Sequence, residues 1–224
     1  MRPPRPSLTE AEARNIESRV AAVEAATGVQ VVCAVHARAD SYPEAPWRAF
    51  AMGTVMTALA AFATDVARPD WVAAGTVQLA LLALLGVGLA AAAATIVFPS
   101  WARLFIGGPR LVVEVDERAR ALFVTAGLAR TPGSHAVLVF TSLFERRVAI
   151  VADRAFDTRV AAEDWQAVVA AMGRLLAAGD TERALVAGLD VLVARLSSAG
   201  FVAGASQVAT DTLPNVMLEA RGRA

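Results

Sequence analysis

Two long stretches without charged side chains dominate the pattern of hydrophobic and polar positions. They cover residues 49–64 and 71–98, and the polar segment "DVARPD" separates them. A bilayer core of about 30 Å needs roughly 20 helical residues, so the second stretch can span a membrane, and the first can if its helix continues past Asp65. The pattern therefore predicts a transmembrane hairpin over residues 47–101. Indole rings prefer the membrane–water interface, and the ends of the two stretches carry Trp47, Trp71 and Trp101.

The segments on either side of this hairpin have the pattern of a water-soluble α/β domain. Apolar positions at helical spacing predict helices over 7–28, 112–129, 162–179 and 180–198. Apolar runs bounded by turn residues predict strands over 29–37, 134–142 and 146–153. The last stretch, 201–224, is rich in Gly, Ser and Thr, and we expect a loosely held tail there.

Neither flank is predicted to form a domain by itself. The single helix and strand before the hairpin cannot bury their apolar faces. Two membrane crossings return the chain to the side that it left. Residues 8–46 and 102–200 can therefore be two parts of one domain, with the hairpin 47–101 inserted in a connection.

Arginines predict the orientation of the hairpin. The loop between the two apolar stretches offers only Arg68, which lies beside two aspartates, whereas both outer ends are basic. The positive-inside rule then places both termini in the cytoplasm. The arginines at the outer ends are Arg38, Arg48, Arg103 and Arg110.

Composition excludes several kinds of chemistry. Every Lys or Arg position holds arginine, so a lysine Schiff base, a lysine general base and a phosphate-loop lysine are all absent. The formal net charge of +0 gives no reason to expect nucleic-acid binding. Cys33, the single cysteine, excludes an internal disulfide, and its apolar strand-like setting predicts an inert core thiol.

Acidic residues after the last predicted strand are the candidates for chemistry. A turn of about five residues centred on Phe144 would place Thr141 opposite Arg147 and His135 opposite Asp153. Further carboxylates follow soon after, and carboxylate oxygens suit Mg²⁺ or Ca²⁺. The candidate metal ligands are Asp153, Asp157 and Asp164.

A purely structural interpretation of these acids is the alternative. Asp164 favours a helix N-terminus, and Arg154 and Arg159 can neutralise the other two carboxylates. We expect no other cofactor.

The turn "SLFER" is predicted to lie at the opposite end of the sheet from Asp153. A helical crossover makes strands 29–37 and 134–142 parallel, so the turn emerges where the chain leaves for the membrane. The two groups of charges are then separated by one strand length, roughly 20 Å. Phe144 would point toward the lipid interface or the helix connections, and Arg146 could meet anionic headgroups. A solvated turn without lipid contact is the alternative.

Five segments together resemble the TPM domain, in the bacterial membrane version that two transmembrane helices interrupt. They are "LTEAEARNIESRVAAVEAATGVQVV", "SYPEAPWRAFAMG", "HAVLVFTSLFERRVAIVADRAF", "W-QAVVAAM" and "AAGDTERALVAGLDVL". The resemblance implies an α/β/α sandwich with a small mixed sheet, located at the bacterial inner membrane. Related members are linked with photosystem repair, receptor modulation, phosphatase activity or divalent metal binding. Where relatives commonly have glycine in "ADRGI", this chain has Ala155, which disfavours a site that needs close backbone approach there.

The combined expectation is a non-catalytic, membrane-anchored accessory protein in membrane-protein assembly, quality control or envelope maintenance. Its expected partners are the lipid bilayer and either another membrane protein or a second copy bound through the hairpin. The alternative is a metal-dependent phosphatase that uses the acidic residues, with Asp153 and Asp157 as examples. A small transporter is disfavoured because the spans contain few polar side chains.

Overall fold

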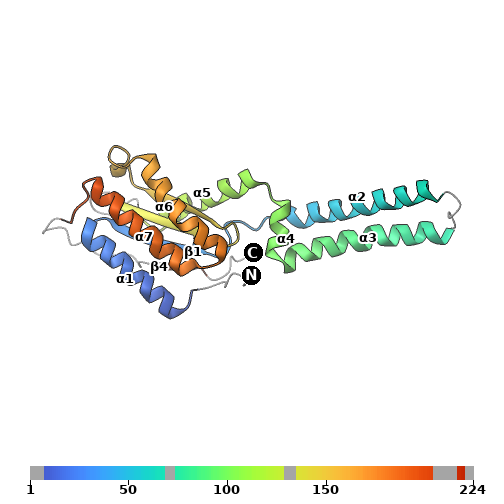
Figure 1. The fold of residues 1–224 in the computed structure, drawn as a ribbon, viewed down its shortest axis with the longest axis horizontal. Coiled ribbons are helices and arrows are strands. Elements are labelled where there is room, and N and C mark those ends of the chain that lie inside the picture. Colours follow the sequence, from blue (N-terminus) through green and yellow to red (C-terminus); the bar gives the residue numbers. More distant parts are fainter. Residues whose placement is uncertain (1–7, 69–73, 129–134, 204–215, 220–224) are drawn as a thin grey trace. The chain divides into compact units, whose positions relative to one another are not determined.

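A computed structural model describes residues 8–68, 74–128, 135–203 and 216–219, and Figure 1 shows the course of the chain. The chain forms two compact units. The first contains residues 1–40 together with 112–224, and the second contains residues 41–111. Residues from both sides of the inserted segment thus build the first unit.

The first unit combines helices with a small mixed sheet, so the fold is α/β. Its first helix begins with a capping box in which Thr9 accepts from the Glu12 N–H and Glu12 accepts from the Thr9 N–H. Gly28, at φ 68°, ends that helix. In chain order the elements are α1 (Glu10–Thr27), β1 (Gln30–His36), α5 (Gly108–Thr125, whose first turn belongs to the second unit), β2 (Ala136–Ser142), β3 (Arg147–Ala152), the 3₁₀ helix η4 (Arg154–Phe156), α6 (Ala162–Ala178), α7 (Thr181–Ser198) and β4 (Val216–Glu219).

The strand order of the sheet is β3-β2-β1-β4. β1 pairs with β2 in parallel, from Gln30 opposite Ala136 to His36 opposite Ser142. β3 returns antiparallel to β2, and β4 pairs in parallel with the other edge of β1. β1 is therefore an interior strand, and all 7 of its residues are buried.

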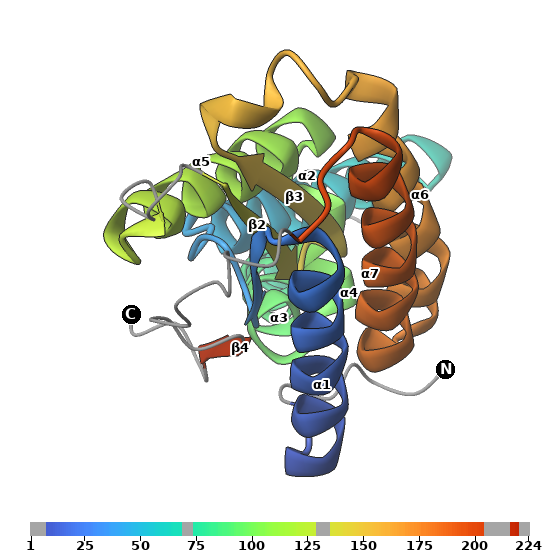
Figure 2. The ribbon, with the colours of Figure 1, turned by 90° about the vertical axis from the view of Figure 1, so that its left-hand side faces the viewer.

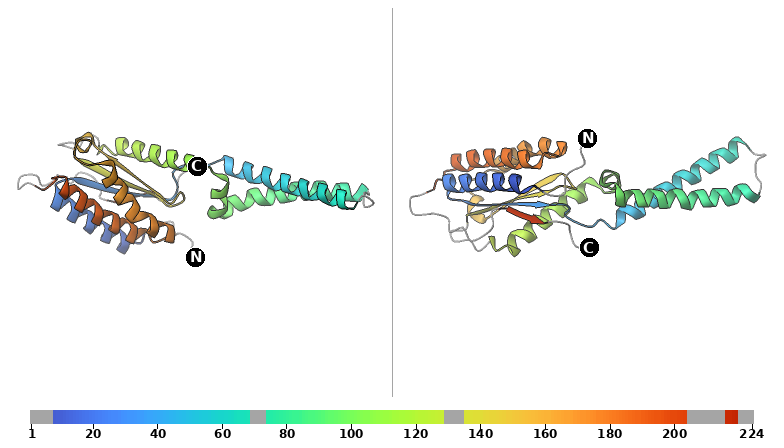
Figure 3. Two further views of the ribbon diagram at one scale, coloured as in Figure 1. Left: turned by 45° about the horizontal axis from the view of Figure 1, so that its top comes forward. Right: turned by 90° about the horizontal axis from the view of Figure 1, so that it is seen from below.

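Helices cover both faces of this sheet (Figures 2 and 3). On one face, α1, α6 and α7 pack together against β1 and β2, and the buried core there includes Ile16, Met172 and Leu189. On the other face, α5 contributes Val115, Ala119 and Phe123 to a second, smaller core. Because alternate strand residues point to opposite faces, one strand supplies both cores.

The second unit contains a pair of antiparallel apolar helices (Figure 1). Its elements are α2 (Glu44–Ala67), α3 (Ala74–Val97), α4 (Pro99–Ala102) and the 3₁₀ helix η2 (Arg103–Phe105). Glu44 forms an ion pair with Arg110 at 2.9 Å, so this unit extends beyond the predicted segment 47–101 at both ends. α2 and α3 are long and apolar enough to cross a membrane.

Two details differ from the prediction. The loop between β2 and β3 has four residues, 143–146, because β2 continues through Ser142 and Arg146 adopts the left-handed conformation with φ 53°. Ser142 rather than Thr141 therefore lies opposite Arg147, and the expected pairing of His135 with Asp153 is wrong by one residue. The tail differs too, since four of its residues, 216–219, form β4. The rest of it from 204 onward lies outside the described residues.

The contact between α6 and α7 leads to a test of the packing in the first unit. A Cβ added to Gly188 would lie 2.6 Å from Sδ and 2.7 Å from Cγ of Met172, which is itself fully buried. We expect Gly188→Ala to lower the free energy of unfolding by about 1–3 kcal/mol, because an overfilled core forces its neighbours to shift. Thermal unfolding of the detergent-solubilised protein, followed by circular dichroism, measures the change.

Gly173→Ala is the matched control, because a Cβ there meets nothing within 4 Å. It should leave stability unchanged or raise it by up to about 1 kcal/mol through helix propensity. Equal effects of the two substitutions would contradict the packing argument.

Candidate functional site

The two ends of the sheet carry different groups of polar residues, as predicted. β1 and β2 run in parallel, so their carboxyl ends meet at one edge, and the turn 143–146 lies there. Asp153 follows β3 at the other edge, where its N–H donates to the Ala136 carbonyl at 3.1 Å. The charged residues of the β2–β3 hairpin therefore cannot form a single site.

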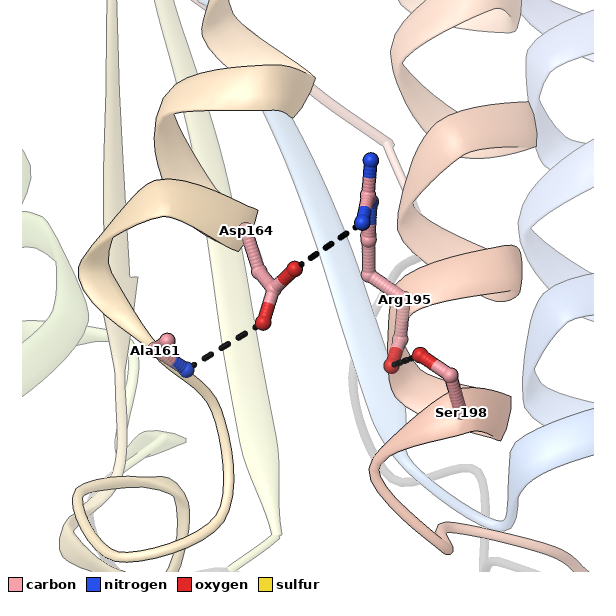
Figure 4. A network of polar contacts seen from close by, with 4 residues as sticks. All are labelled: Ala161, Asp164, Arg195 and Ser198. Atoms are coloured by element: carbon pink, nitrogen blue, oxygen red, sulfur yellow. Dashed lines mark hydrogen bonds and ion pairs between the residues drawn. The ribbon is translucent and has the colours of Figure 1, made fainter.

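The predicted metal ligands have local structural roles. The Oδ1 atom of Asp153 caps η4 by accepting from the Arg154 N–H at 2.7 Å. Asp157 is exposed after η4. Asp164 accepts from the Ala161 N–H at 3.2 Å and forms an ion pair with Arg195, also at 3.2 Å (Figure 4).

These three acids do not assemble into a shared site. Among the residues that the structure describes, no group of three His, Cys, Asp or Glu side chains is placed to hold a metal ion. The ring of His135 lies 6.2 Å from that of Phe156 and 5.7 Å from that of Phe201, in an aromatic cluster. A Mg²⁺ or Ca²⁺ site at these acids remains a prediction.

The predicted interface residues differ in exposure. Trp47 is 74% exposed and Trp101 is 39% exposed, whereas Trp71 lies outside the described residues. Phe144, expected to point toward the lipid interface or the helix connections, is buried, and the Arg38 guanidinium lies 4.2 Å above its ring. Arg146 is half-buried in the turn.

The carboxyl edge of β1 and β2 holds a buried polar group that the sequence reasoning missed. We call His36, Ser142 and Glu145 the edge cluster; all three are buried. His36 and Ser142 are register partners and so share a face of the sheet, where the His36 ring lies 4.8 Å from that of Phe140 in the second core.

Glu145 joins the turn to the chain that leaves β1. Its carboxylate accepts a hydrogen bond from the Ser142 hydroxyl and another, at 3.0 Å, from the Ala39 N–H. A carboxylate that is only 5% exposed needs such donors, because burying an unpaired charge is costly. The two bonds therefore fix residue 39 against the turn.

Backbone bonds extend this connection. The Leu143 N–H donates to the His36 carbonyl at 2.9 Å, and the Phe144 N–H donates to the Ala37 carbonyl at 3.0 Å. Together with the contact of Arg38 with Phe144, they fasten residues 36–39 to the turn immediately before the second unit begins at Ser41.

The bonding pattern of the edge cluster is structural, although Ser, His and Glu are also the residue types of hydrolytic triads. A hydroxyl has a single proton, and Ser142 donates it to the Glu145 carboxylate rather than to an imidazole. A triad requires the serine to be hydrogen-bonded to its base and open to substrate. Ser142 is fully buried, so the cluster is suited to holding the chain in place.

A sequence signal for the edge cluster did exist. Ser142 and Glu145 have the S-x-x-E spacing of a helix capping box, and here the spacing serves a hairpin turn. Periodicity alone assigns such residues to a solvated loop.

Comparison with known proteins shows a similar fold and gives no information on function. No family model and no curated protein matches this sequence. The NMR structure of the BA42 protein from the psychrophilic bacterium Bizionia argentinensis is similar, with a TM-score of 0.56 and 13% identity, over 95% of each chain. Likeness at this level of identity concerns the fold alone.

Removing the Glu145 carboxylate tests the role of the edge cluster. Glu145→Ala leaves the Ala39 N–H and the Ser142 hydroxyl without this acceptor, so we expect a loss of about 2–4 kcal/mol in the free energy of unfolding. Amide hydrogen exchange at Ala39 should become faster. Glu117→Ala, an exposed glutamate in the middle of α5, should change stability by less than about 0.5 kcal/mol. Unchanged exchange at Ala39 would refute the proposed attachment.

The thiol of Cys33 provides a pH-dependent test. Burial, with a smaller contribution from the negative charge of Glu24, raises its pKa from 9.0 to about 12. The folded state therefore keeps the proton longer, so stability from this site is fully present below pH 9 and falls as the pH rises toward 12. Iodoacetamide at pH 8 should react with Cys33 only in denaturant. In the Cys33→Ala variant, the part of the stability loss at alkaline pH that this thiol causes should disappear. Rapid alkylation of Cys33 in the native protein would contradict its burial.

Proposed function

We propose that this chain is a membrane-anchored, TPM-like accessory protein of the bacterial inner membrane, and that it is not an enzyme. In this proposal α2 and α3 cross the bilayer as an inserted hairpin, both termini are cytoplasmic, and the α/β unit works next to the membrane. Assembly, quality control or envelope maintenance of membrane proteins is the proposed setting.

The observation that carries the proposal is the exposed apolar surface of the two long helices. Within the most apolar 18-residue window of each, only 6% of α2 and 11% of α3 is buried. Leu59, Phe62 and Leu82 are 58%, 66% and 68% exposed. Soluble monomers rarely expose apolar patches of more than a few hundred Å², whereas hydrocarbon covers such helices without cost.

Polar groups within the helices support a bilayer setting. The hydroxyls of Thr54, Thr57 and Thr64 donate to carbonyls one turn earlier in α2, at 2.6–2.8 Å. Each hydroxyl proton is thus satisfied within its own helix, as a medium without water requires.

The pairing of α2 with α3 also fits a membrane hairpin. A Cβ on Gly88 would lie 2.9 Å from both the Phe50 ring and the Thr54 hydroxyl, so the absence of a side chain permits close approach. Close packing at small residues is a main source of helix association in lipid, where no hydrophobic force draws the helices together. The base is closed by the Glu44–Arg110 ion pair and by Arg48, which donates to the Phe105 carbonyl at 2.9 Å.

A partner in the membrane follows from the same surface. Either another membrane protein or a second copy would bind through the hairpin, because its outward faces are apolar while the edge cluster is buried. An accessory role needs a binding surface and a fixed attachment, and the exposed apolar helices and the bonds of residues 36–39 to the turn support this proposal.

Topology reporters test the proposal. Fusions after Ala67 and after Ala224 should report opposite sides of the membrane, and the protein should stay in the membrane pellet during alkaline carbonate extraction. Leu85→Arg should reduce membrane insertion, because an arginine at the centre of a span costs about 2.5–3.5 kcal/mol. The control is Leu104→Arg, an exposed leucine beyond the end of α3. Recovery of the wild-type chain in the soluble fraction, or two reporters on the same side, would refute the proposal.

The phosphatase alternative is tested on the same preparation. Turnover of a phosphate ester with Mg²⁺ or Ca²⁺ that is lost in Asp153→Asn would replace the non-catalytic proposal. Absence of turnover in both proteins is the result that we expect.

A further inference from the structure

The chain turns back sharply after the second apolar helix. α3 ends at Val97, Phe98 adopts an extended conformation with φ −114° and ψ 100°, and Pro99 starts the short helix α4. The Trp101 indole N–H donates to the Ala91 carbonyl at 3.3 Å, ten residues earlier in the chain. The Trp101 side chain therefore ties α4 to the last turns of α3.

An open groove of about 460 Å³ lies between α3 and the segment that turns back. Its lining is almost entirely apolar, with the Ser100 hydroxyl as the one polar side chain. The lining residues are Ala94, Phe98, Ser100, Trp101 and Leu104. This volume is within the range of small-molecule sites, about 300–1,000 Å³.

The walls of the groove continue the exposed apolar surface of α3. Phe98 and Leu104 are 58% and 72% exposed, and Ile96, near the end of α3, is 77% exposed. The Trp101 ring also makes an edge contact with Phe105, with ring centroids 5.5 Å apart. One wall of the groove, the Trp101 ring, is thus held in place, and the groove opens from the surface that faces hydrocarbon in the proposed function.

We propose that this groove binds one acyl chain of a membrane phospholipid. The inference rests on the proposed function. In that function the bilayer surrounds α3, so lipid acyl chains are the apolar molecules present at the groove. An apolar notch with one hydroxyl has no charged group to select a polar ligand. Its continuity with the surface of α3 lets a chain enter sideways while the headgroup stays at the interface.

Filling the groove tests this proposal. Ala94→Phe places an aromatic ring in the groove, whereas Ala93→Phe adds the same ring one residue away on the exposed side of α3, outside the lining. The detergent-solubilised full chain is mixed with phosphatidylglycerol carrying sixteen-carbon chains, and retained lipid is counted by native mass spectrometry. The wild type and Ala93→Phe should each retain one phospholipid, and Ala94→Phe should retain at least tenfold less.

A second variant keeps the test informative if Ala94→Phe misfolds. Leu104→Ser removes an exposed wall of the groove, so it leaves the packed core intact and should also lower retention at least tenfold. Exchange of the headgroup for phosphatidylcholine should leave retention unchanged, because the groove contacts the chain. Equal retention by all four proteins, or a wild type that forms lipid-free dimers, would overturn the proposal.

Different results would refute the acyl-chain groove and the membrane anchoring. Reporters on opposite sides of the membrane combined with equal lipid retention refute the groove and leave the anchoring intact. Recovery of the wild type in the soluble fraction refutes the anchoring itself.

Discussion

The parallel pairing of β1 with β2 is the interaction on which the rest of the first unit depends. β1 comes from before residue 41 and β2 from after residue 111, so the pairing joins the two sides of the inserted segment. Both faces of β1 are buried, and strands lie along both of its edges. Any insertion after β1 must therefore return the chain to the same end of the sheet from which it left. Two antiparallel helices do this, and a single long helix would not.

The direction of that pairing explains the position of the edge cluster. Because β1 and β2 are parallel, the end at which the chain leaves β1 is also the end at which β2 turns into β3. Glu145 lies in that turn and binds the Ala39 N–H, next to the boundary between the units. A single buried carboxylate, held by Ser142, thus joins the interior of the sheet to the segment that leads to α2.

Much of the fold could be predicted from periodicity, whereas details set by single backbone conformations could not. The apolar patterns predicted α1, β1, α6 and α7, and the uncharged stretches predicted α2 and α3. The hairpin register failed because Arg146 adopts positive φ, a conformation that nothing in an arginine's propensity indicates. Side chains alternate between the two faces along a strand. In the observed register Asp153 therefore lies opposite Ala136 and not His135, so the reason for placing Asp153 and His135 in one site is lost. The burial of Phe144 beneath Arg38 could not be predicted, because the turn's own sequence does not indicate which segment will cover it.

The inserted hairpin has packing contacts of its own. Gly53 and Gly88 face the opposite helix so closely that a Cβ on either would lie 2.9–3.3 Å from it, whereas a Cβ on Gly86 would meet nothing within 4 Å. Small residues of both helices are thus used in the contact within the hairpin, whereas Gly86 is not part of it. The Glu44–Arg110 ion pair then closes the base of the same unit. An insertion that is paired along its length and closed at its base holds its two ends together, which is the condition that the pairing of β1 with β2 requires.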